Sequence, residues 1–167
     1  LAMSLSNALA SNNSKLRSLR LTTECLTSAG VGVFKHALQN PYSMLEELDL
    51  GTNEVELDTV LATLSSALVN NRQLKQLHFG FDKMMLIRAE SYMDGEDDYY
   101  FHDNDVIMGI IRDILYNRSS IIDTYLSNHT LEKICEYDVS IVSNEVRSLL
   151  ELNRNNTASV AARLKVL

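Results

Sequence analysis

The sequence predicts an α/β solenoid in which a short parallel sheet lines the concave side and helices form the convex side. The pattern LxxLxL occupies residues 16–21, 45–50 and 74–79, so its copies begin 29 residues apart twice in succession. After each of the first two copies, the apolar period changes from the alternation of a half-buried strand to the three- and four-residue spacing of a helix. Neither element buries its apolar side alone, so neighbouring units are expected to stack.

Each unit is expected to run strand, loop, helix, loop. The chain opens on the apolar spacing of an amphipathic helix, and we interpret this start within a helix as a sign that the sequence is a fragment. A fourth strand is expected at 131–135, where the lead-in Asn128-His-Thr resembles the Asn71-Arg-Gln that precedes the third strand. The residues that define the helical stripes are Leu1, Leu5, Leu9, Val31, Phe34, Ala37, Leu38, Val60, Leu61, Leu64 and Leu68.

The repeat pattern fails at residues 83–104, which we interpret as an acidic insertion inside one expanded unit. Residues 90–105 hold seven acids and no Lys or Arg, so the whole net charge of −7 resides there. The helix of that unit is expected to begin only after the insertion, with Asp103 or Asn104 as its cap and with apolar residues over 106–115 facing the core.

An alternative interpretation treats the 57 residues between the third and fourth copies as two degenerate repeats. Asp103, Val106 and Met108 would then occupy strand positions. An acidic residue at the first buried position of a strand makes this the weaker choice.

The C-terminal part, about residues 136–167, is expected to cap the exposed apolar edge of the last repeat. Two helices over 144–152 and 157–167 have suitable apolar spacing, and we expect residues 1–167 to form a single domain. The residues expected to face the core from these helices are Val146, Leu149, Leu150, Leu152, Val160, Ala161, Leu164 and Leu167.

At LxxLxLxxN, seen best at 45–53, the sequence resembles the leucine-rich repeats, specifically the ribonuclease-inhibitor-like kind with 28 to 29 residues per unit. Residues 119–131 resemble the closing segment of a large group of uncharacterised eukaryotic leucine-rich-repeat proteins. The resemblance implies a horseshoe-shaped fold and protein recognition through the concave face. It also implies a ladder of asparagines that bond the loop backbone between neighbouring units, and the positions of that ladder are Glu24, Asn53 and Asp82 here. Only Asn53 keeps the asparagine of that ladder.

The candidate binding surface consists of the outward positions of the strands and the aromatic residues of the acidic insertion. Aromatic side chains are enriched where protein interfaces gain most of their affinity. The acidic insertion suits a basic protein partner, while the simpler interpretation is a solvated loop on the rim. The candidate contact residues are Arg20, Glu47, Asp49, Gln76, His78, Lys133, Tyr99, Tyr100 and Phe101.

Catalysis is a weaker hypothesis for the same strand positions. Asp49, His78 and Cys135 in neighbouring strands would mimic a thiol triad, in which the carboxylate orients the imidazole that deprotonates the thiol. An open sheet without a Gly-rich turn offers no evident oxyanion hole, and charge pairing between Arg20 and Asp49 is the simpler explanation. We therefore do not expect an enzyme.

Composition narrows the remaining classes of function. The net charge of −7 argues against nucleic acid and anionic membranes as partners, and no apolar run approaches a membrane span. No metal or phosphate motif is present, so no cofactor is expected. Two cysteines are too few for a disulfide framework and favour an intracellular, cytoplasmic protein. A structural role, as the closing cap of a longer repeat protein, is the alternative to partner binding.

Overall fold

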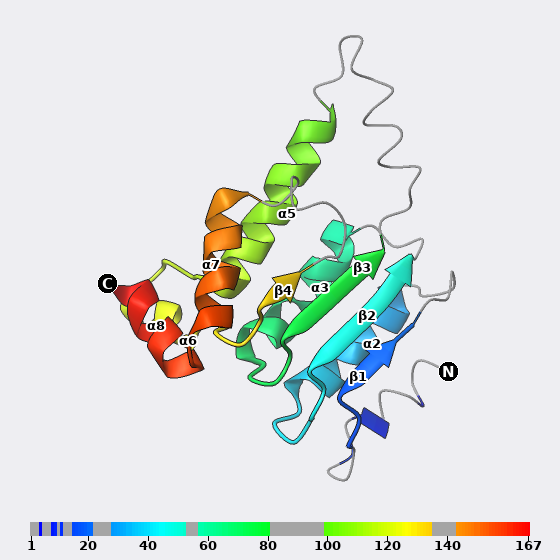
Figure 1. The fold of residues 1–167 in the computed structure, drawn as a ribbon. Coiled ribbons are helices and arrows are strands. Elements are labelled where there is room, and N and C mark those ends of the chain that lie inside the picture. The colour runs from blue at the N-terminus through cyan, green and yellow to red at the C-terminus, as the bar shows by residue number, and fades with distance from the viewer. Residues whose placement is uncertain are drawn as a thin grey trace.

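Leucine-repeat segments form one four-stranded sheet in the computed structural model of the chain (Figure 1). All neighbouring strands are parallel, and their order β1-β2-β3-β4 follows the order of the sequence. The structure describes residues 4, 8, 9, 11, 15–21, 28–52, 57–80, 99–134 and 143–167. The elements are β1 (Ser18–Arg20), α2 (Ser28–Gln39), β2 (Glu47–Thr52), α3 (Leu57–Asn70), β3 (Gln76–Gly80), α5 (Tyr99–Leu115), α6 (Ile121–Leu126), β4 (Lys133–Ile134), α7 (Asn144–Asn155) and α8 (Ala158–Val166).

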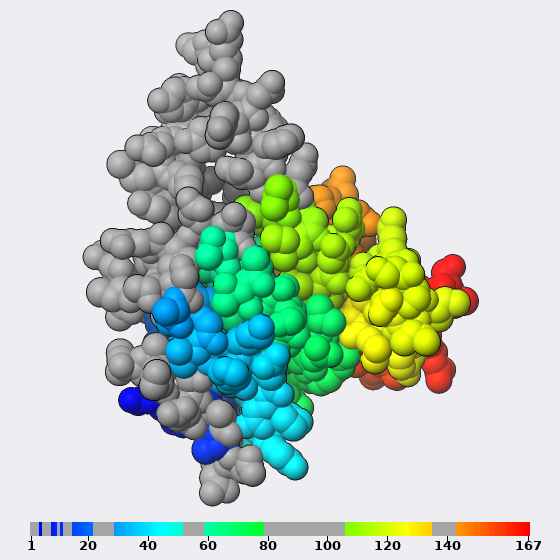
Figure 2. All heavy atoms as spheres, turned by 180° about the vertical axis from the view of Figure 1, so that it is seen from behind, coloured from blue at the N-terminus to red at the C-terminus, as the bar shows by residue number. Residues whose placement is uncertain are grey.

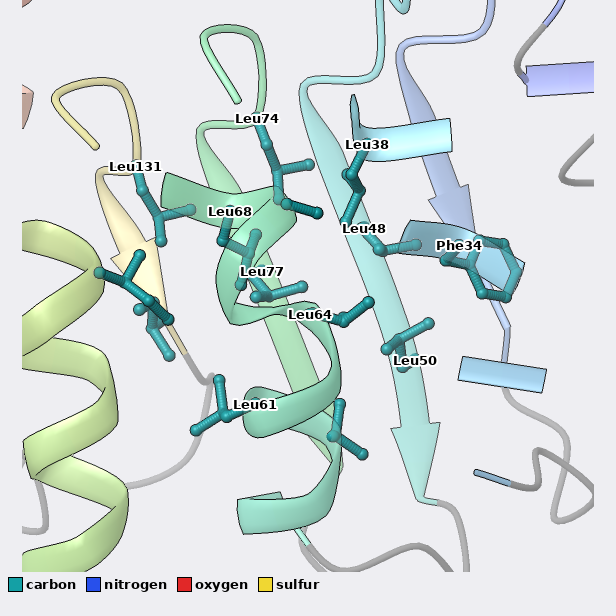
Figure 3. Close-up of a cluster of buried hydrophobic side chains, with 14 of the residues drawn as sticks. Phe34, Leu38, Leu48, Leu50, Leu61, Leu64, Leu68, Leu74, Leu77 and Leu131 are labelled. Atoms are coloured by element: carbon teal, nitrogen blue, oxygen red, sulfur yellow. The ribbon is translucent and has the colours of Figure 1, made fainter. Parts of the chain in front are cut away.

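The register of the sheet places equivalent leucines of successive units side by side. Leu19 pairs with Leu48, Leu48 with Leu77, and Leu77 with Ile134. Leu48, Leu77 and Ile134 are buried, and Leu19 is partly buried against the same core. Figure 3 shows Leu48 and Leu77 pointing into one interior together with Leu74 and Leu131. The predicted parallel sheet, with these leucines on neighbouring strands, is therefore confirmed.

A layer of helices covers the apolar face of this sheet. Helix α2 packs against α3, and α3 packs against α5, so the helices follow the same order as the strands (Figure 1). Each helix turns one stripe of large apolar side chains inward, as the three- and four-residue spacing predicts. Large side chains of these stripes that are fully buried include Phe34, Leu38, Leu61, Leu64, Leu68 and Ile111.

Helix α5 begins earlier than the sequence predicts. Its backbone is helical from Tyr99, whereas Asp103 or Asn104 was the expected cap. The three aromatic residues assigned to a rim loop, at positions 99–101, therefore belong to the first turn of a helix. Because β3 pairs directly with β4, the alternative with two degenerate repeats is wrong, and Met108 lies in α5.

Helix α6 was not predicted, because the expected architecture assigned only loop to the residues before β4. Its signal was nevertheless present as Ser120-Ile-Ile-Asp123, an N-cap residue followed three positions later by an acid. Ser120 Oγ accepts a hydrogen bond from the backbone N–H of Asp123 at 3.0 Å and donates one to the Asp123 carboxylate at 2.7 Å. This capping holds a helix that is only six residues long.

Two buried asparagines, one before β3 and one before β4, each bond the backbone of the preceding unit. Asn71 donates from Nδ2 to the carbonyl oxygen of Leu38 at 2.7 Å, and its Oδ1 accepts from the backbone N–H three residues later at 2.6 Å. Asn128 repeats this arrangement, with Nδ2 donating to the carbonyl oxygen of Leu68 at 2.6 Å. The sequence similarity of the two lead-in segments therefore reflects a shared role. The ladder implied for Glu24, Asn53 and Asp82 lies outside the described residues.

Helix α7 continues this asparagine contact at the last strand, where Asn153 Nδ2 donates to the carbonyl oxygen of Leu131 at 2.7 Å. Its apolar face is buried as predicted, at Val146 and Leu150. Helix α8 differs from the prediction, because Val160, Leu164 and Leu167 are exposed and the buried positions are Ala161, Ala162 and Lys165.

Lys165 is the most unusual of these buried residues. Its ammonium group donates to the carbonyl oxygens of Leu115, at the end of α5, at 2.7 Å and of Asn128 at 3.0 Å. Burial, and then the charge of Arg72, lowers the pKa of Lys165 to about 7. Burial, and then the charge of Lys165, lowers the pKa of the neighbouring His129 to about 4. A basic group at a helix C-terminus compensates the partial negative charge of the last carbonyls.

The low pKa of Lys165 predicts that the free energy of unfolding rises with pH between about 7 and its ordinary value of 10.5. In that range the unfolded chain binds a proton that the folded chain does not, and one such group contributes at most about 1.4 kcal/mol per pH unit. Urea unfolding across this range should show a steeper rise for the wild-type chain than for Lys165→Met. Equal slopes in the two proteins would contradict the prediction.

Candidate functional site

The face of the sheet opposite the helices carries two rows of polar side chains. Successive residues of a strand point to opposite faces, so the neighbours of the buried Leu48 and Leu77 point away from the core. The register aligns the predicted contact positions one strand after another. The first row is Ser18, Glu47, Gln76 and Lys133, and the second is Arg20, Asp49 and His78.

Side chains 29 residues apart contact each other across this face. Ser18 Oγ donates to Glu47 Oε2 at 3.0 Å, and Arg20 Nε lies 2.7 Å from Asp49 Oδ2. Asp49 Oδ1 also accepts from the backbone N–H of Gly51 at 2.9 Å, where a φ of 59° and a shift in register bend the end of β2. The predicted pairing of Arg20 with Asp49 is present.

Two of the three members of the second row are buried, which alternation along a strand does not predict. Asp49 is only 9% exposed and His78 only 4%, although both were predicted as contact residues. His78 Nε2 lies 3.3 Å from Gln76 Oε1 and 3.9 Å from Glu47 Oε1, and its buried Nδ1 has no hydrogen-bond partner among the described residues. Asp49 and His78 therefore support their neighbours. The accessible or half-buried members are Ser18, Arg20, Glu47, Gln76 and Lys133.

A third row of charged side chains lies just before the strands and was not predicted. Glu46 pairs with Arg17 of the preceding unit and, at 2.9 Å from Oε2 to Nζ, with Lys75 of the following unit. The hydrogen bond from Lys75, followed by the charges of Lys75 and Arg17, keeps the pKa of Glu46 below its ordinary value. The signal was visible as alternating charge at the second position of each LxxLxL motif.

The aromatic residues of the predicted site are not brought together with the sheet by any described contact. Tyr99, Tyr100 and Phe101 lie in the first turn of α5, and their side chains lie outside the described part of the structure. The acids between residues 90 and 98 also lie outside it.

The thiol-triad hypothesis receives no geometric support from the residues that can be placed. Asp49 directs one carboxylate oxygen to Arg20 and the other to the backbone of Gly51, while His78 faces Gln76 and Glu47. Within the described ranges, no hydrogen bond joins Asp49 to His78, which the orientation of a catalytic imidazole requires. Cys135 lies outside those ranges.

The described residues contain neither a metal site nor a membrane-spanning helix. Among them, no group of three or more His, Cys, Asp or Glu side chains is arranged to hold a metal ion. In the same part of the chain, no helix has both the length and the apolar character needed to cross a membrane.

The fold and this surface define an α/β chain whose parallel sheet has helices on one face and rows of polar side chains on the other. No protein-family model, no curated protein and no solved structure matches the chain. What the chain does is therefore inferred from its own sequence and geometry.

Proposed function

We propose that the chain is a leucine-rich-repeat solenoid of the ribonuclease-inhibitor-like kind, and that it binds a protein partner through the polar face of its sheet. The support is the coincidence of the 29-residue sequence period with contacts between side chains 29 residues apart. This period, the parallel sheet and the helices on one face are what the resemblance implies. The small number of cysteines supports an intracellular, cytoplasmic location.

The observation that carries the binding function is the ordered mixture of charges on that face. Arg20 is held by Asp49, and Glu47 by Ser18, so these side chains lose little conformational freedom when a partner binds. Both signs occur on neighbouring strands, which favours a specific partner with a complementary polar surface. A stable complex needs a total buried area of at least about 1,200 Å², so the partner must also contact the rim of the sheet.

Charge reversal on the sheet tests this proposal. Lys133 lies at a half-buried position of the first row, and the half-buried Lys35 on α2 provides the same charge change on the helical side. Quantitative affinity capture should show that Lys133→Glu lowers the amount of captured partner at least about fivefold, whereas Lys35→Glu captures as much as the wild-type chain. Thermal unfolding followed by circular dichroism checks that both variants fold. Equal retention, or equal loss by two folded variants, would contradict binding through the sheet.

A deletion of residues 90–98, which leaves the whole of α5 in place, tests the contribution of the acidic segment. If this segment recognises a basic partner, the deletion should release the same protein that Lys133→Glu releases. Retention of that protein would restrict the binding surface to the sheet.

The alternative proposal is structural, as the closing cap of a longer repeat protein whose recognition surface lies upstream. It is favoured by the contacts of Asn153 and Lys165, which place α7 and α8 over the backbone around β4. Partner capture that depends on additional repeats before Leu1, and not on Lys133, would favour this function.

A further inference from the structure

The largest group of exposed apolar side chains in the described structure lies on α6 and α8. Ile121 is 72% exposed and Ile122 is 70% exposed, although both are β-branched apolar residues on a well-capped helix. Contiguous exposed apolar surface marks an interaction site more often than isolated exposed residues do. The members of this surface, which we call the α6–α8 surface, are Ile121, Ile122, Tyr125, Leu126, Val160, Leu164, Val166 and Leu167.

The α6–α8 surface is hollowed. A hollow of about 500 Å³ lies between the two helices, and its walls come from both. The atoms that line it are apolar, so Arg163 contributes its aliphatic stem while its charged group stays at the edge. In Figure 2, α6 forms the protruding yellow region at the end of the molecule opposite β1, with parts of α8 in red beside it.

The apolar side chains of this surface are not needed to close the core of the chain. Thr124 is the buried residue of α6, and its hydroxyl donates to the carbonyl oxygen of Asn117 at 2.7 Å. Ala161, Ala162 and Lys165 are the buried residues of α8. The inward faces of both helices are thus occupied, and the isoleucines project from a rigid base on the outward face.

Comparison with α7 shows what an ordinary outer face looks like in this protein. The exposed positions of α7 are Asn144, Glu145, Ser148, Glu151, Arg154 and Asn155, all polar. A terminal cap needs a polar outer face to stay soluble, and α7 meets that requirement. The outward face of α6 and α8 does not, so a bound partner is its simplest explanation.

The charges at the edge restrict the chemistry of that partner. Arg163 is exposed and has no acidic partner within the described ranges, and Arg72 reaches the same end of α6 by donating to the carbonyl oxygen of Leu126 at 2.9 Å. The described residues that line the hollow include no Asp or Glu side chain. In a two-fold dimer through this surface, the residues that line the hollow in one copy would offer no acidic side chain to Arg163 of the other. A chain with a net charge of −7 is unsuited to an anionic membrane.

We propose that the α6–α8 surface binds an amphipathic helix of a partner protein, with the apolar face of that helix in the hollow and an acidic side chain beside Arg163. A groove between two helices that receives the apolar face of a third is a recurring mode of peptide recognition. This surface is separate from the polar face of the sheet, so it gives the chain a second contact.

Two synthetic helical peptides test the proposal by fluorescence anisotropy with the full chain. Both carry leucines along one face, and they differ only in a glutamate or a lysine at the edge of that face. The glutamate peptide should bind the wild-type chain more tightly. Ile122→Ser should weaken its binding at least about tenfold, since an isoleucine contact is lost, and Arg163→Glu should reverse the preference between the peptides.

Val106→Ser is the matched control, because Val106 is an exposed β-branched residue on α5 outside this surface. It should leave peptide binding unchanged. Lys133→Glu should also leave peptide binding unchanged, so the peptide experiment tests the α6–α8 surface independently of binding through the sheet. The proposal is overturned if neither peptide binds, or if Arg163→Glu leaves the preference intact. It is also overturned if sedimentation shows self-association that Ile122→Ser abolishes, or if phosphatidylserine vesicles bind the surface instead.

Discussion

Replacing Leu74 with alanine should lower the free energy of unfolding by about 2–5 kcal/mol, the range for large-to-small substitutions in a well-packed core. Leu74 is completely buried between the sheet and the helices (Figure 3). Its side chain lies where the units meet, so the cavity cannot be filled by movement of a surface loop. Urea unfolding followed by circular dichroism measures the change.

Leu16 is the control for this experiment, because it occupies the same motif position two repeats outward and is 40% exposed. Leu16→Ala should cost less than about 1 kcal/mol, since much of its side chain already contacts water. Equal losses at the two positions would mean that the leucines do not share the interior described above.

Replacing Asn128 with alanine should cost about 2–4 kcal/mol, although the side chain is polar. Its Nδ2 donates to the carbonyl oxygens of Leu68 and Asn71, and its Oδ1 accepts from the N–H groups of Thr130 and Leu131. Asn128 is fully buried, so water cannot replace these partners without entering the core.

Asn70 provides the matched control for the asparagine substitution. It is exposed, and its Nδ2 makes a local bond of 3.0 Å to the carbonyl oxygen of Ser66 within α3. Asn70→Ala should be close to neutral, because alanine favours the helix by roughly the amount that the exposed bond contributes. If Asn128→Ala left the free energy of unfolding unchanged in the same urea experiment, the buried asparagines would not be what stabilises the contact between units.

The sheet could be predicted because its determinants repeat. Leu19, Leu48 and Leu77 recur at one interval, and a single interval specifies which strands are neighbours and which residues face each other. The stripes of α2 and α3 follow in the same way, since a period of three and four residues identifies the inward side of a helix.

The features that the sequence did not predict depend on contacts that are made at one place in the fold and are not repeated from unit to unit. Alternation assigns Asp49 and His78 to the outward face but does not reveal that both are buried there. Nothing in the local sequence of α8 indicates that Lys165 turns inward, because its partners are backbone carbonyls 50 and 37 residues away. The exposed isoleucines of α6 were missed for a related reason, since apolar residues are expected to face the core.

The row formed by Arg17, Glu46 and Lys75 also favours the observed choice of neighbouring strands. The strands themselves are similar enough that β1 could pair with β3, and such a mispairing would satisfy the leucines. It would also set Arg17 against Lys75, two like charges at one site, while Glu46 lost both of its partners. Alternating charge at these positions therefore disfavours a pairing that skips a unit, by the modest amount that exposed ion pairs contribute.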